Sequence, residues 1–358
     1  MKIINLVGAR PQFIKAAPIS REIKKNKRIK EIIVHSGQHY NKELSKNFFL
    51  ELNIPTPKYN LNVGSHDHPT QISKIILKLV KIIKYEKPDW IIVYGDTNTT
   101  LAGAIAGNRS GIKIAHVESG IRSYNNDMPE EINRVLTDRL SNVLFCPTIK
   151  ATNNLKKENI KDNVYLVGDV MFDNFKYYIK KFNSNILNEL KLKKNNYVLL
   201  TIHRSQNTEI EKRLSNIIYC VNNLAKSIKI IFPVHPRTLK YIKYFKIKSD
   251  KIIFVNPLSY KKLITLLKNC KFVATDSGGL QKEAFFAKKQ CVTLRNETEW
   301  PETLEFNNNI LCPPDNRKNI SLILSKISKK NYNIKTKKTF GNGNSAKKII
   351  KIIEKFKT

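Results

Sequence analysis

The sequence alternates short apolar runs with longer amphipathic segments from one end to the other. The runs are rich in Val and Ile, as buried strands are, and the segments between them show the apolar spacing of a helix that buries one face. Consecutive parallel strands need a crossover connection, which is usually a helix. The alternation therefore predicts an α/β fold class with doubly wound parallel sheets covered by helices on both faces.

The strongest apolar runs and amphipathic segments give the predicted strands and helices. The strands are Lys2–Val7, Glu31–His35, Trp90–Tyr94, Lys113–Val117, Val143–Cys146, Val164–Val167, Tyr197–Ile202, Lys229–Val234, Ile252–Val255, Phe272–Thr275 and Gln290–Leu294. The clearest helices are Pro69–Tyr85, Glu130–Leu140, Arg213–Ser227, Tyr260–Cys270, Leu280–Ala287 and Ser345–Phe356.

The length and one break in the pattern indicate two domains. The chain has 358 residues, and a domain takes about 150. The segment Val170–Asn196 is rich in Lys, Asn and Phe and has no clear strand, so it is predicted to connect the halves. We expect domains at 1–169 and 170–344, with a last helix, 345–358, returning to the first. In two such domains facing across a cleft, ligands bind outside the carboxyl ends of the strands.

The net charge is strongly positive, with 64 Lys and Arg against 29 Asp and Glu, a difference of +35. The excess is mostly lysine spread along the whole chain, which argues against a specific nucleic-acid site. It predicts instead a positive field that attracts anionic substrates. No apolar stretch approaches the ~20 residues that cross a bilayer, and the first residues resemble a strand more than a signal peptide. We expect a cytoplasmic protein without membrane insertion.

The five cysteines lie far apart and form no C-x-x-C pair. This spacing fits neither a zinc site nor a disulfide framework, so they are interpreted as small apolar core residues. The residues are Cys146, Cys220, Cys270, Cys291 and Cys312.

Two cations flank the start of the first predicted helix. Arg10 follows the first strand, Pro11 suits the first turn of a helix, and Lys15 lies one turn later. A helix N-terminus with two nearby cations favours an anion. The alternative is an ordinary solvated turn.

Carboxylates follow two further strands of the same predicted sheet. Asp96 comes after the third strand and Glu118 after the fourth, so both side chains are expected in one crevice. Asp96 could instead cap the next helix, whereas Glu is a poor cap. Glu130 lies in the first turn of a predicted helix, on the same face as Asn133 and Arg134. The alternative is that an acidic residue is there only because it is favourable in the first turn of a helix. Clustered carboxylates of this kind serve as general acids and bases.

The second half repeats the arrangement with other residue types. His203 and His235 follow two strands, and Asp276-Ser277-Gly278-Gly279 follows a third and opens a helix. Two glycines and a serine at a helix start admit a pyrophosphate. The alternatives are histidines satisfied within the core and a plain tight turn. Because the G-x-G-x-x-G motif, the Walker loop and metal-ligand spacing are all absent from the sequence, we expect a nucleotide-linked substrate without metal or nicotinamide cofactor.

Together these motifs resemble the non-hydrolysing UDP-N-acetylglucosamine 2-epimerase family over nearly the whole chain. The matching segments are Gly8–Lys15, Ser36–His39, Tyr94–Asn98, His116–Glu118, Pro129–Arg134, Thr201–Arg204, Val234–Arg237, Asp276–Gly279 and Thr298–Glu299.

The resemblance implies a two-domain GT-B architecture, a homodimer and a role in making precursors of surface polysaccharides. It further implies inversion of C2 of a UDP-2-acetamido sugar by elimination of UDP to a 2-acetamidoglucal and re-addition. Matched to the family, the catalytic positions are Asp96, Glu118, Glu130 and His203, with the base and the acid unassigned. The positions matched to substrate binding are Arg10, Lys15, His235, Ser277, Gly278, Gly279 and Glu283.

Three departures from the family pattern bear on regulation and substrate. Residues Tyr40–Lys42 diverge from the allosteric branch, which predicts hyperbolic kinetics. In the family pattern that the chain resembles, the position of Trp300 carries an arginine. Gly8–Lys15 and Gln281–Phe286 are closer to UDP-2,3-diacetamido-2,3-dideoxyglucuronate 2-epimerases, which gives a close alternative. A GT-B glycosyltransferase or a non-catalytic nucleotide-sugar or nucleic-acid binder are further alternatives, although neither explains three clustered carboxylates.

Overall fold

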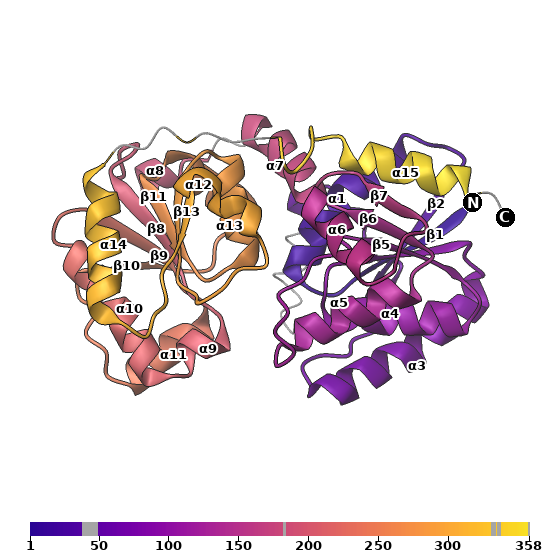
Figure 1. Cartoon of the computed structure of the whole chain (residues 1–358), viewed down its shortest axis with the longest axis horizontal. Coiled ribbons are helices and arrows are strands. Elements are labelled where there is room, and N and C mark those ends of the chain that lie inside the picture. The colour runs from indigo at the N-terminus through magenta and orange to yellow at the C-terminus, as the bar shows by residue number, and fades with distance from the viewer. Residues whose placement is uncertain (38–48, 182–183, 331–333, 335–337, 357–358) are drawn as a thin grey trace. The chain divides into compact units, whose positions relative to one another are not determined.

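The computed structural model describes residues 1–37, 49–181, 184–330, 334 and 338–356. The chain divides into two compact units, Met1–Lys176 with Lys338–Thr358, and Tyr177–Lys337. Each contains one parallel sheet with helices on both faces (Figure 1). The predicted α/β fold class with two Rossmann-like domains of the GT-B type is confirmed. The predicted domain boundaries at 169/170 and 344/345 stay a prediction.

The first unit is built on a seven-stranded sheet in the order β3-β2-β1-β4-β5-β6-β7. The strands are β1 (Lys2–Val7), β2 (Lys30–His35), β3 (Tyr59–Asn60), β4 (Trp90–Tyr94), β5 (Lys113–Val117), β6 (Val143–Cys146) and β7 (Val164–Leu166). Its helices are α1 (Arg10–Lys24), α3 (His68–Glu86), α4 (Asn98–Arg109), α5 (Pro129–Leu140), α6 (Ile149–Lys157), most of α7 (Val170–Lys181) and α15 (Ser345–Lys355).

Helices cover both faces of this sheet because its strands are apolar on both sides. The fully buried Ile4, Leu6, Ile91 and Val93 belong to the core beneath α3 and α4. On the other face α1 lies beside α15 (Figure 1). The end of the chain is thereby held against the first unit, where Phe356 meets Trp90 edge-on.

The second unit is built on a six-stranded sheet in the order β10-β9-β8-β11-β12-β13. The strands are β8 (Tyr197–Thr201), β9 (Lys229–Pro233), β10 (Ile253–Val255), β11 (Phe272–Thr275), β12 (Gln290–Thr293) and β13 (Asn309–Leu311). Its helices are α8 (Ile186–Glu189), α9 (Ser205–Thr208), α10 (Glu211–Leu224), α11 (Pro236–Tyr244), α12 (Tyr260–Asn269), α13 (Gly278–Phe286), α14 (Arg317–Lys329) and the 3₁₀ helix η1 (Pro301–Asn307).

Both sheets reverse their strand order at one point, between β1 and β4 and between β8 and β11. At such a switch point the connections leave in opposite directions, so the carboxyl ends of the two strands bound a crevice in which ligands bind. The fold therefore singles out one ligand-binding edge in each unit.

All the predicted strands are present, with ends within one residue of the prediction. The sequence analysis missed β3 and β13, which are short edge strands of mixed polarity. The segment predicted as a connector holds α7 and α8, and α7 crosses the division between the units.

The five cysteines are buried and free of disulfides, as their spacing predicts. Among the described residues, no helix is both long and apolar enough to cross a bilayer. The same residues contain no cluster of three or more His, Cys, Asp and Glu side chains suited to hold a metal ion.

Candidate active site

Asp96 and Glu118 lie at the carboxyl ends of the neighbouring strands β4 and β5. The strands run in register up to the pair Tyr94 and Val117, and the Gly95 amide donates to the Val117 carbonyl at 2.9 Å. Glu118 has φ +73°, a left-handed conformation that costs a non-glycine residue about 1–3 kcal/mol. Strain of this size persists where the surrounding structure enforces it, as it does at functional sites.

A buried lysine pairs with Glu118. The Lys15 Nζ atom lies 2.5 Å from Glu118 Oε1, and each side chain is 7% exposed. A Cβ atom on Gly95 would lie 2.8 Å from that ammonium, and the φ of +64° at this position also favours glycine. The sequence analysis grouped Lys15 with Arg10 as ligands of an anion. The structure instead places the Lys15 ammonium against a carboxylate, because α1 buries this face.

Gln12 occupies part of the anion site predicted at the start of α1. Its Oε1 atom accepts from the amides of Gly8 and Ala9 at 2.8 and 3.1 Å, and its Nε2 atom donates to the Tyr94 carbonyl at 3.2 Å. The side chain thus ties the β1 loop to the end of β4 across the switch point. Arg10, which is partly exposed, is the first residue of the same helix.

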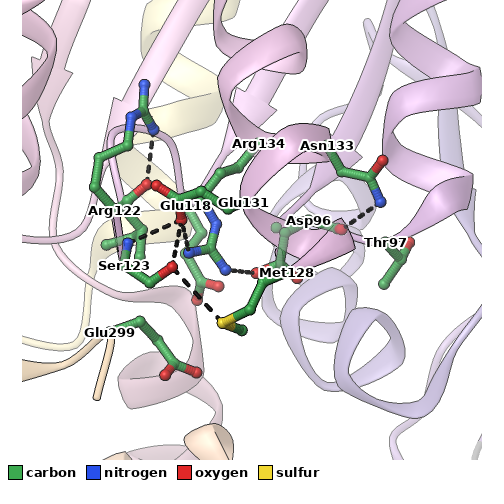
Figure 2. A network of polar contacts seen from close by, with 12 residues as sticks. Asp96, Thr97, Glu118, Arg122, Ser123, Met128, Glu131, Asn133, Arg134 and Glu299 are labelled. Atoms are coloured by element: carbon green, nitrogen blue, oxygen red, sulfur yellow. Dashed lines mark hydrogen bonds and ion pairs between the residues drawn. The ribbon is translucent and has the colours of Figure 1, made fainter. Parts of the chain in front are cut away.

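Asp96 belongs to a second buried ion-pair network, which Figure 2 shows. Arg134 pairs with Asp96 through Nη2 and with Glu131 Oε2 at 2.8 Å through Nη1. Glu131 in turn accepts from the amides of Ser123 and Tyr124 at 2.8 and 3.0 Å. This network leaves the Asp96 side chain 30% exposed while holding it in place.

The structure decides against Asp96 as a helix cap. The cap of α4 is Thr97, whose hydroxyl accepts from the Thr100 amide at 3.4 Å. The Asp96 carbonyl accepts from Asn133 Nδ2 at 2.9 Å, which brings the start of α5 to this loop.

Of the two adjacent acids on α5, the exposed Glu130 is the one that the sequence analysis chose, and the buried Glu131 is the one it missed. The Glu131–Arg134 spacing of three residues was the available signal, because such pairs meet on one helix face. Glu130 lies in the first turn of the same helix, one residue from the network that reaches Asp96.

In the second unit, Asp276 organises the crevice between β8 and β11. It is fully buried, and its oxygens accept from the amides of His203 and Arg204 at 3.1 and 3.0 Å. Burial alone would raise the pKa of Asp276, but the His203 side chain and these amides outweigh it and lower the pKa. His203 Nδ1 lies 3.2 Å from the carboxylate, and its side chain is 52% exposed. Asp276 therefore orients a histidine that remains open to a ligand.

The remaining predicted ligands of this unit surround the start of α13 and α11. Ser277 caps α13, accepting from the Leu280 amide at 3.4 Å. A Cβ atom on Gly278 would lie 2.3 Å from Glu299 Oε1, so the Glu299 carboxylate closely approaches the start of α13. The buried Glu283 accepts from the Tyr260 hydroxyl at 2.9 Å.

His235 caps α11, and its Nδ1 atom accepts from the Arg237 amide at 3.2 Å. Partial burial, Arg237 and His203 lower the pKa of His235, which favours the neutral ring with its proton on Nε2 as a donor. The divergent segment Tyr40–Lys42 lies outside the described residues.

Two Rossmann-like units, each with a cluster of titratable residues at its switch point, define an enzyme of the GT-B structural class. Comparison with known proteins identifies the family within this structural class. The family described as UDP-N-acetylglucosamine 2-epimerase matches residues 21–354. The chain belongs to this family and is therefore an isomerase.

Three known proteins illustrate the similarity. A UDP-N-acetylglucosamine 2-epimerase homolog of Methanococcus maripaludis is 51% identical, and the match covers 99% of each chain. The UDP-2,3-diacetamido-2,3-dideoxy-D-glucuronate 2-epimerase of Pseudomonas aeruginosa is 41% identical over 87% of this chain and 88% of its own. A crystal structure of Methanocaldococcus jannaschii UDP-GlcNAc 2-epimerase in complex with UDP-GlcNAc and UDP superposes with a TM-score of 0.92 at 41% identity, covering 99% of this chain and all of the other.

Proposed function

We propose that the protein is a non-hydrolysing UDP-N-acetylglucosamine 2-epimerase that inverts C2 of the sugar to the manno form. The observation that carries this proposal is the placement of Asp96 and Glu118 at the ends of adjacent strands, each beside a buried cation. Relatives of similar length that carry this name support the choice of substrate.

The proposed reaction is an anti elimination followed by re-addition, because the C2 proton is too weakly acidic for simple removal. A carboxylate takes the C2 proton, the electron pair forms the C1–C2 double bond, and the C1–O bond breaks as UDP leaves. A second group then protonates the opposite face of C2, and a β-phosphate oxygen of UDP bonds again to C1. This chemistry needs two proton-transfer groups and fixed donors for the diphosphate.

Most of the proposed proton-transfer groups belong to the first unit, and most of the proposed UDP ligands belong to the second. Asp96, Glu118 and Glu130 are the proposed proton-transfer groups together with His203, and the base and the acid remain unassigned among them. The proposed ligands of the phosphates and ribose of UDP are Arg10, His235, Ser277, Gly278, Gly279 and Glu283. Lys15 and Arg134 offset the charge of the carboxylates beside them.

Incubation with UDP-N-acetylglucosamine in D₂O tests the proposal. We expect a mixture of the gluco and manno epimers with deuterium at C2 of both, detected by proton NMR. Glu118→Gln is the matched control and is expected to slow exchange and epimerisation together. Epimer formation without deuterium, or no turnover of this sugar, would contradict the proposal.

The diacetamido uronate is the second candidate substrate, because a 41% identical relative is named for it. Paired measurements of kcat/KM on both UDP-sugars distinguish the two. A hundredfold preference for plain UDP-N-acetylglucosamine would exclude the uronate as the natural substrate.

The role in surface polysaccharide precursors, the cytoplasmic location, the homodimer and hyperbolic kinetics stay predictions. Sedimentation of the purified protein at micromolar concentration tests the dimer. A Hill coefficient clearly above one would contradict the expectation drawn from Tyr40–Lys42.

A further inference from the structure

A buried His116–Asp138 pair contacts the two loops that carry the candidate carboxylates of the first unit. His116, on β5, has its Nδ1 atom 2.7 Å from Asp138 Oδ1 and its Nε2 atom 2.8 Å from the Gly95 carbonyl oxygen. Neither side chain has any exposed surface. The mechanism proposed above assigns no role to either residue.

The other side of Asp138 is bound as firmly. Its Oδ2 atom accepts from Arg122 Nη1 at 2.7 Å and from the Gly120 amide at 3.1 Å. Arg122 forms a bidentate pair with Glu158, with distances of 2.6 and 2.8 Å. Burial alone would raise the pKa of Asp138, but His116 and Arg122 outweigh it and lower the pKa.

The two ends of this network are the two loops that carry the carboxylates. Gly95 immediately precedes Asp96, and Gly120 follows Glu118 by two residues. Both glycines adopt positive φ, +64° and +75°, so neither loop is held by a regular strand conformation. A Cβ atom on Gly120 would lie 2.3 Å from the Ala151 carbonyl oxygen, so this loop also fits tightly against α6.

The chemistry of His116 suits a fixed link rather than a reacting group. Its two nitrogens face a carboxylate and a carbonyl, which are both acceptors, so both bonds form when each nitrogen carries a proton. A ring enclosed in this way has no surface left for a substrate.

We propose that His116 is a positioning residue: with Asp138 it joins the Gly95 and Gly120 loops and so sets the separation of Asp96 and Glu118. The inference rests on the proposed function for its kinetic consequence. A displacement of about 1 Å in reacting groups can cost about a hundredfold in rate. None of the residues proposed to bind UDP belongs to this network, so KM is expected to depend little on it.

Two substitutions separate the two bonds of His116. The amide of His116→Asn can replace Nδ1 toward Asp138 but does not reach Gly95, whereas the amide of His116→Gln can replace Nε2 toward Gly95. We expect kcat to fall about 10- to 100-fold in His116→Asn and less in His116→Gln, with KM changed by no more than about twofold.

The matched control is Glu31→Gln, a substitution of a partly buried polar residue in the same unit. Glu31 lies near the start of β2 and accepts from Asn5 and Ser20 at 2.7 and 2.6 Å, far along the chain from both loops. It is expected to lower the melting temperature and leave kcat unchanged. An equal loss of kcat in the control would show a general effect of destabilisation and overturn the proposal.

Amide hydrogen exchange tests the positioning independently of turnover. We expect faster exchange, by at least about tenfold relative to wild type, in His116→Asn for the amides of Gly95, Glu118 and Gly120. The exchange rates of the same amides should be unchanged in Glu31→Gln. Unchanged exchange or wild-type kcat in folded His116→Asn would overturn the inference. If wild type turns over neither UDP-sugar, the proposed function fails, while the exchange result still decides the positioning.

Glu158→Gln serves if the histidine variants do not fold. Glu158 is 25% exposed and holds only the outer end of Arg122, so the variant should fold. Faster exchange of the Gly120 amide, with a kcat loss of about threefold, is expected from a loosened Arg122. Unchanged exchange there would contradict the network.

Discussion

Each unit pairs a buried aspartate with a histidine near a strand end, but the two pairs differ in exposure. His116 is fully enclosed against Asp138, whereas His203 is 52% exposed beside the fully buried Asp276. Both aspartates also accept backbone amides of neighbouring loops. The same pair of residue types thus fixes a loop where it is enclosed and presents a donor where it is open.

The functional groups at the two switch points also differ in charge. The first unit presents carboxylates held by Lys15 and Arg134, whereas the second presents histidine, a helix N-terminus and glycines. Carboxylates suit proton transfer and the second set suits a diphosphate. The same strand order therefore carries two different sets of functional groups, because these groups lie in the loops after the strands.

The sharpest test of this division is removal of the carboxylates. Asp96→Asn and Glu118→Gln should each lower kcat about a hundredfold or more, the scale of a positioned acid or base. Because Glu130 is exposed and outside the ion-pair network, Glu130→Gln should cost less than either. At least one variant should release UDP and the glycal, since elimination and re-addition use different groups. Steady-state kinetics with NMR of the products measures this, and near-normal kcat in all three variants would refute the assignment.

Folding stability should separate the two buried aspartates. Asp138→Asn leaves the enclosed His116 without a charged partner and Arg122 with Glu158 alone, which costs about 3–5 kcal/mol of unfolding free energy. Asp276→Asn keeps an acceptor for the backbone amides and leaves a histidine that water can reach, so we expect about 1–3 kcal/mol. Urea unfolding at pH 7 compares them. A larger loss of unfolding free energy in Asp276→Asn than in Asp138→Asn would contradict the expectation that the enclosed His116–Asp138 pair contributes more to stability.

The pH dependence follows from the same two groups. The folded pKa of each aspartate is lowered, so the unfolded chain binds its proton first as the pH falls. Their stabilisation is therefore complete at neutral pH and is lost below the unfolded pKa of about 3.9. We expect the contribution of these two aspartates to be constant from pH 8 to 5 and to fall steeply below pH 4, so that the loss of stability below pH 4 is less steep in either Asn variant. Stability that rises on acidification below pH 4 would contradict these shifts.

Much of the fold and part of the site could be predicted from the sequence, and the difference has a physical cause. Strands buried on both faces leave continuous apolar runs, so their ends also mark where Asp96, Glu118 and His203 stand. No strand end precedes the three helical residues that the sequence analysis missed, which are Glu131, Asp138 and Gln12. A polar residue inside a helix cannot be told from a surface residue until its partners are known. The sequence analysis assigned Lys15 to an anion site because its pairing with Glu118, which follows β5, is a tertiary contact between residues far apart in the sequence.

Ser277 separates a structural from a binding role in the second unit. Ser277→Ala removes the cap of α13 and costs about 1 kcal/mol of stability. Ser259→Ala removes the matching cap of α12 in the same unit and should cost about the same. If Ser277 also holds the diphosphate, its variant alone should raise KM by about tenfold, the value of one hydrogen bond to a charged group. Equal KM in both variants would leave Ser277 a cap only.

The smallest effect is expected at Trp300, where the family pattern carries arginine. The side chain is 3% exposed, and the Lys282 ammonium lies 3.7 Å from the ring centroid. This cation covers one ring face, and the low exposure leaves little of the ring for a sugar substituent to contact. Trp300→Arg would place a second cation beside the buried Lys282 and should lower the melting temperature by several degrees. We expect the ratio of kcat/KM between the two UDP-sugars to change by less than about tenfold, because one altered polar contact is worth about 1 kcal/mol. A change of a hundredfold would restore Trp300 as a determinant of the sugar.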